Sequence, residues 1–147
     1  VEMKPKGFEH AHGMHGECVG VGTIMCARAY HEYAKRETIE VKPFEPLDEA
    51  WVRDEFGALA DGIFKENEND VLKTFDPENI KTHWQEIREI INTIPSADEL
   101  IELYTKIGAK HSLKELDIDE SVRGDFLDIS SAIRNRLTFA RMTRLIK

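Results

Sequence analysis

The sequence has only two cysteines and no apolar run long enough to cross a bilayer. Both features limit the class of protein to which the chain can belong. Cys18 and Cys26 fall in one predicted helix. Their spacing of eight residues at 1.5 Å each separates them by about 12 Å, too far for a disulfide. The start, with Pro5 and Gly7 among charged residues, also lacks the pattern of a secretory signal peptide. We therefore expect a reduced, cytoplasmic protein with no membrane partner.

Positive charge and phosphate-binding glycine loops are scarce as well. With 20 Lys and Arg against 28 Asp and Glu, the formal net charge is −8, which argues against a general nucleic-acid-binding surface. No glycine-rich fingerprint follows a strand, so we expect no NAD(P) site within this chain alone. No segment alternates polar and apolar residues convincingly, and no hairpin signal is present, which excludes a substantial sheet.

Apolar residues instead recur at spacings of three and four in every long segment, which predicts an all-α fold. The length of 147 residues suits one domain, 1–147, and is too short for two comfortable ones. We expect a bundle of about six to eight helices, with helical segments at 15–36, 48–67, 68–74, 76–93, 96–106, 113–116 and from 119 to the end with a break near Asn135.

The apolar spacing also predicts which side chains of these segments are buried. The first helix carries apolar residues, Val19 among them, on more than one side, so it is expected to be central and buried. Ser96 and Glu99 predict a capping box at the start of the 96–106 helix. Four apolar residues of that segment are expected to point inward: Leu100, Leu103, Tyr104 and Ile107.

A histidine-rich loop with His10, His12 and His15 leads into the first helix. Such a histidine is either a helix cap, a satisfied half-buried side chain or a metal ligand. After it, the helix carries glycines at 16, 20 and 22, each costing about 0.5–1 kcal/mol relative to alanine. Gly16 and Gly20 continue with Thr23 and Ala27 as a stripe of small residues on one face, which lets a backbone or a ligand approach closely.

The stretch Met14-His15-Gly16-Glu17-Cys18-Val19-Gly20-Val21-Gly22-Thr23 resembles the glycerol-1-phosphate dehydrogenases, within the iron-containing alcohol dehydrogenase and dehydroquinate synthase-like superfamily. Members carry His-Gly-Glu-x-Val-Gly-Val-Gly-Thr at the start of a long buried helix in their all-α C-terminal half. The stretch from Ala60 to Trp84 and the segment Ile133-Arg134-Asn135-Arg136-Leu137-Thr138 agree with that family, although Leu137 stands where tyrosine is usual.

The resemblance implies that His15 is one protein ligand of a catalytic divalent metal, usually zinc. Catalytic zinc takes three protein ligands and an open position. In the family, the other two are an aspartate and a first histidine from a Gly-Ser-Glu-His-like motif. Phe8-Glu9-His10 echoes that motif but lies too close to His15, so we expect both ligands, and the NAD(P)-binding half, to precede this chain.

The resemblance further implies a small phosphorylated polyol as substrate, a metal and NAD(P) as cofactors of the full-length enzyme, and homo-oligomers. This chain alone is expected to be inactive and to hold neither cofactor. Two alternatives remain open: a dehydroquinate synthase-like lyase domain, which shares the His-Gly-Glu element, and a freestanding α-helical metal-binding module that uses His10, His12 and His15.

The end of the chain is basic, with Arg134, Arg136, Arg141, Arg144 and Lys147 and no acidic residue after position 133. Two explanations are open. One is placement at a helix C-terminus with the arginine heads solvated, and the other is a salt contact with an acidic partner or a phosphate. Arginines spaced along one helix are not expected to face a single point, which favours the first.

Overall fold

The computed structural model describes residues 5–147, and its described part is all-α, as the spacing predicted. Those residues contain no β-strand; Val41 and Ile146 form an isolated antiparallel bridge. No described helix has the length and apolarity that a membrane span needs. The α-helices are α1 (His15–Ala34), α2 (Glu49–Phe56), α3 (Ala60–Glu66), α4 (Glu78–Thr82), α5 (Trp84–Asn92), α6 (Ala97–Lys106), α7 (Val122–Ile133) and α8 (Phe139–Met142). Short 3-10 turns occur at η1 (Gly57–Leu59), η2 (Val71–Thr74), η3 (Lys114–Leu116) and η4 (Thr143–Leu145).

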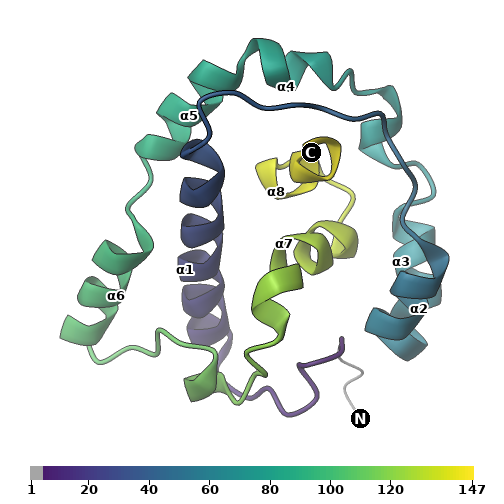
Figure 1. Cartoon of the computed structure of the whole chain (residues 1–147). Coiled ribbons are helices and arrows are strands. Elements are labelled where there is room, and N and C mark those ends of the chain that lie inside the picture. The colour runs from purple at the N-terminus through teal and green to yellow at the C-terminus, as the bar shows by residue number, and fades with distance from the viewer. Residues whose placement is uncertain (1–4) are drawn as a thin grey trace.

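The longest helix, α1, is the element around which the others are placed (Figure 1). It contacts α5, α6, α7 and α8. Figure 1 shows α6 on one side of α1 and α7 on the other, with an arc of helices from α5 through α4 to α3 and α2 passing around α7 and α8. The segment between α1 and α2 crosses from one side of this arrangement to the other. A long connecting segment therefore lies before α1 and another lies after it.

Contrary to expectation, α1 is not buried on every side. Its buried residues are Gly20, Val21, Ile24, Ala27 and Ala34, while Val19 is 53% exposed. The small-residue stripe is used only in part. A Cβ placed on Gly20 would lie 2.7 Å from Cε2 of Tyr104 on α6, whereas one on Gly16 or Gly22 would meet nothing within 4 Å. The close approach of α6 explains one glycine of the three.

This difference gives a stability prediction with a built-in control. Gly22→Ala should raise the free energy of unfolding by about 0.5–1 kcal/mol, because alanine favours the helix and the site has room. Gly20→Ala should gain nothing or lose stability, because its methyl group meets the Tyr104 ring. Urea unfolding of both variants measures this, and an equal gain from the two would show that α6 does not press on Gly20.

Two segments predicted as single helices are each broken. The 48–67 segment divides at Gly57, because its φ of 49° lies outside the right-handed helical region. The helical structure resumes with η1 and α3. The 76–93 segment divides at His83, with φ −101° and ψ 17°. Beyond that break, the Trp84 indole donates to the carbonyl oxygen of Arg36 at 2.9 Å, joining α5 to the end of α1. The Ser96 capping box is confirmed, with Ser96 Oγ 3.2 Å from the Glu99 amide.

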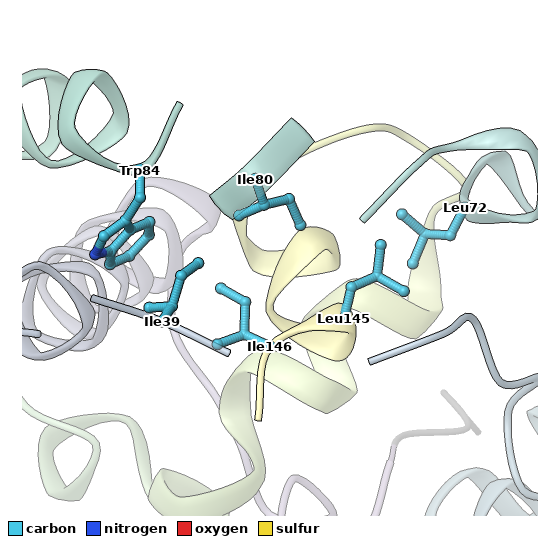
Figure 2. Packing of buried hydrophobic residues seen from close by; sticks show 6 residues of the cluster. All are labelled: Ile39, Leu72, Ile80, Trp84, Leu145 and Ile146. Atoms are coloured by element: carbon cyan, nitrogen blue, oxygen red, sulfur yellow. The ribbon is translucent and has the colours of Figure 1, made fainter. Parts of the chain in front are cut away.

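Three groups of buried apolar residues hold these elements together. Figure 2 shows the first group, whose side chains come from the 35–48 connection, η2, α4, α5, the end of η4 and the residue after it: Ile39, Leu72, Ile80, Trp84, Leu145 and Ile146. A second joins α2 and α3 to α7 through residues such as Val52, Phe56 and Ile129. A third closes the start of α1 against η3 through Val21 and Leu116. The expected inward face of the 96–106 segment was wrong for Leu103, which is 52% exposed, and for Ile107, which is 68% exposed. Tyr104 does face α1, where it meets Gly20.

Candidate functional site

His15, the residue predicted as a metal ligand, is the first residue of α1 and is exposed. The loop before it is fixed by Glu17, whose carboxylate accepts a hydrogen bond from the Met14 amide at 2.8 Å and lies 3.2 Å from Lys110 Nζ. The Met14 amide, more than Lys110, holds the pKa of Glu17 below its usual value. Within the described residues, the His15 ring makes no hydrogen bond or ion pair, so its nitrogens are available to a ligand.

His15 lines an open depression of about 730 Å³ between the N-terminal loop, the first half of α1 and η3. His12 and Cys18 line it as well, with apolar walls from Leu116 and Phe126. Both His15 and Cys18 belong to the first turns of α1 and face this space. The structure therefore places the His-Gly-Glu motif at the rim of a depression.

The three histidines of the loop do not form a metal centre on their own. His12 is engaged with Asp117, with 2.8 Å between Nδ1 and Oδ2, and its amide donates to the carbonyl of Leu116. Over residues 5–147, no three His, Cys, Asp or Glu side chains are grouped so that they could hold a metal ion. Among the described residues, His15 therefore belongs to no group of three side chains that could hold a metal ion.

A larger cleft, of about 830 Å³, adjoins this depression. Val21, Met25 and Phe126 line both, so the two spaces share a wall between α1 and α7. The cleft runs along α1 and is bounded by the chain from Lys42 to Asp48, by α7 and by η4. This volume falls within the range of small-molecule binding sites.

Asp128 projects from α7 into this cleft. Burial, and then repulsion from Asp125, raise the pKa of its carboxyl group above the usual value, although Arg144 and Lys42 oppose the shift. The carboxylate lacks any hydrogen bond or ion pair to the described residues. Asp128 as a whole is nevertheless exposed, so its carboxylate keeps contact with water and needs no protein partner.

The most heavily buried polar group is one that the sequence did not indicate. The Arg141 side chain is fully buried, and its Nε and Nη2 lie 3.1 and 3.0 Å from the two carboxylate oxygens of Asp70. Its Nη1 donates to the carbonyls of Ser131 and Arg134, and Nη2 also donates to Asn67 Oδ1. Every nitrogen of the guanidinium therefore has an acceptor.

The expectation that the arginines near the C-terminus have solvated head groups was wrong for Arg141 and Arg144. Arg144 Nη1 lies 2.9 Å from Asp70 Oδ2, so Arg141 and Arg144 both face one carboxylate. A spacing of three residues across α8 and η4 brings them to the same side. The salt contact with an acid exists, and its partner is within the chain. Arg136, by contrast, is exposed as expected.

The segment from Ile133 to Thr138, on which the expected resemblance also rested, has structural roles. Asn135 accepts from the Val71 amide at 3.0 Å and donates to the carbonyl of Asn69 at 2.8 Å, which fastens the end of α7 to the turn before η2. Thr138 caps α8, with Oγ1 3.3 Å from the Arg141 amide, and Leu137 is 52% exposed. Asn135 and Thr138 therefore stabilise the chain between the end of α7 and the start of α8.

Comparison with known proteins does not identify a family for this chain. No protein-family model, no curated protein and no solved structure matches the chain, so the resemblance at His15-Gly16-Glu17 is carried by those residues themselves.

Proposed function

We propose that this chain is the C-terminal helical domain of a metal-dependent, NAD(P)-linked oxidoreductase that interconverts dihydroxyacetone phosphate and glycerol 1-phosphate. The observation that carries the proposal is the position of His15. The motif residue opens the longest helix, is exposed, has no partner among the described residues and lines a depression. A histidine that caps the helix would have a hydrogen-bond partner, and one packed in the core would be buried.

The residues present fit one part of a catalytic metal site. The exposed ring of His15 offers one nitrogen ligand, and the Glu17 contacts with Met14 and Lys110 fix the loop that presents it. Bound zinc would polarise the substrate oxygen, so that the alcohol loses its proton as hydride passes to the nicotinamide. The remaining ligands, the nicotinamide site and the water-excluding wall are proposed to come from a preceding nucleotide-binding half.

A competing proposal, the freestanding metal-binding module, is weakened by the pairing of His12 with Asp117. It needs His10, His12 and His15 on one ion, and the described residues do not group them so. The lyase alternative uses the same His-Gly-Glu element but a different substrate. An activity assay therefore distinguishes it from the oxidoreductase. A dehydroquinate synthase-type enzyme would consume a seven-carbon sugar phosphate and show no net change in nicotinamide.

The test compares the complete polypeptide with the 147-residue chain. The complete polypeptide should oxidise NADH or NADPH when dihydroxyacetone phosphate is added, lose this activity to a chelator and regain it with zinc. The short chain should show no activity and no dinucleotide binding by calorimetry, because the proposed cofactor site lies elsewhere. If the complete polypeptide is inactive while the short chain binds zinc stoichiometrically through His10 and His12, the module replaces the enzyme.

A further inference from the structure

The N-terminal loop lies in the junction between α2 and the start of α7. On the α2 side, the Lys6 amide donates a hydrogen bond to the carbonyl oxygen of Glu55 at 2.8 Å. On the α7 side, the loop approaches so closely that a Cβ added to Gly7 would collide with Cγ1 of Val122. Asp125 follows Val122 by three residues and therefore lies on the same side of α7. The loop thus contacts both helices at adjacent residues, and Glu55 and Asp125 belong to the two sides of this junction.

Glu55 is an acidic side chain of this junction that is largely removed from water. The residue is 9% exposed, and its neighbours Val52 and Phe56 on α2 are part of the apolar core. Within residues 5–147, its carboxylate accepts no hydrogen bond and forms no ion pair. A carboxylate in such a position is costly to keep ionised, because the protein does not replace the hydration that burial removes.

The charges that act on Glu55 are mostly of its own sign. Asp125 faces it from α7, Glu9 from the N-terminal loop and Asp54 from α2 itself. Lys6 opposes them, but its Nζ is engaged with Asp54 at 2.9 Å. Burial, and then repulsion from Asp125, raise the pKa of the Glu55 carboxyl group above its ordinary value of 4.5, although Lys6 opposes the shift.

We propose that Glu55 is a proton-dependent clasp, whose protonation strengthens the junction of α2, the N-terminal loop and α7. The neutral carboxyl group loses less hydration on burial and is not repelled by Asp125. Above the folded pKa, ionised Glu55 destabilises the folded chain. This destabilisation decreases as the pH falls through the folded pKa, and it is absent below the unfolded pKa. The clasp is independent of the function proposed for His15.

The experiment compares urea unfolding of the chain with that of Glu55→Gln, which carries a neutral group at every pH. At about pH 7.5, the unfolding equilibrium constant of Glu55→Gln should be at least about threefold smaller than that of the parent. The ratio should approach one as the pH falls to about 4, near the pKa of glutamate in unfolded chains. Asp125→Asn should stabilise the parent at about pH 7.5 more than it stabilises Glu55→Gln, because the second background already lacks the repulsion.

Glu49→Gln is the matched control, because Glu49 lies on the same helix with its side chain 71% exposed. This change should not stabilise the chain at either pH. An NMR titration of the parent adds a measurement without any variant, in which the carboxyl carbon of Glu55 should titrate with a midpoint above 4.5.

The proposal is wrong if Glu55→Gln is no more stable than the parent at about pH 7.5, or if its advantage is unchanged at about pH 4. A midpoint at or below 4.5 for the Glu55 carboxyl group would contradict it as well. So would a gain from Glu49→Gln equal to that from Glu55→Gln, because burial of Glu55 would then not be the cause.

Discussion

Replacing Asp70 with alanine is expected to lower the free energy of unfolding by about 3–5 kcal/mol, because it leaves a buried arginine without its counter-ion. Arg141 has no exposed surface, and Asp70 is 4% exposed. Removing the carboxylate takes away the acceptor of two Arg141 bonds, the partner of Arg144 and the cap of the Leu72 amide. A loss of this size is a large fraction of the about 5–15 kcal/mol by which folded proteins are typically stable.

The control is Asp61→Ala, at a carboxylate whose side chain is 91% exposed and 3.7 Å from Arg53. That change should alter stability by no more than about 0.5 kcal/mol. Urea unfolding with matched slopes gives both values. A loss below 1 kcal/mol for Asp70→Ala would show that the buried pair does not hold α8 and η4 to the turn before η2.

The same pair predicts a dependence of stability on pH. Burial alone would raise the pKa of Asp70, but hydrogen bonds from Arg141, the Leu72 amide and Arg144 outweigh it, and the pKa is held below its ordinary value of 3.8. The contribution of Asp70 is then complete above the unfolded pKa and is lost as the pH falls through the lower folded value. The stability difference between parent and Asp70→Ala should therefore shrink in acid.

The second large effect concerns His15 in the complete polypeptide. His15→Ala should remove bound metal and lower turnover by more than about 100-fold, because losing an outer-shell partner alone costs 10–100-fold and His15 is proposed as a direct ligand. The side chain is exposed and unpartnered within the described residues, so the fold should be unaffected. Metal analysis and circular dichroism on the same preparation separate the two effects.

His12→Ala is the matched control, since His12 belongs to the same loop and is engaged with Asp117. It should keep metal and turnover near the parent values. Equal losses from both substitutions would indicate a general disturbance of the loop, and retention of metal and rate by His15→Ala would show that the motif was assigned wrongly.

Local features of the fold could be predicted from the sequence. The start of α1 at His15 and the capping box at Ser96 depend on residues within one turn of each other, and both are present. The breaks at Gly57 and His83 were missed because the apolar spacing continues across them. At Gly57 the signal was available, since glycine is the residue that takes a positive φ without strain.

Features that depend on distant residues could not be predicted in this way. Asp70 precedes Arg141 by 71 positions, and neither residue differs locally from a surface charge. The exposure of Leu103 has a similar origin, because α6 meets α1 through the Tyr104 ring on Gly20 and presents Leu103 elsewhere. The cleft was also missed, since its walls come from α1, the 42–48 segment and α7.

Anomalous diffraction at the zinc edge from crystals of the complete polypeptide tests whether His15 is a metal ligand. We expect one strong peak about 2.0–2.1 Å from a ring nitrogen of His15, with an aspartate and a second histidine from the proposed preceding half completing the ligand set. A zinc peak coordinated by His10 and His12, or a fully loaded metal site that leaves His15 uncoordinated, would contradict it.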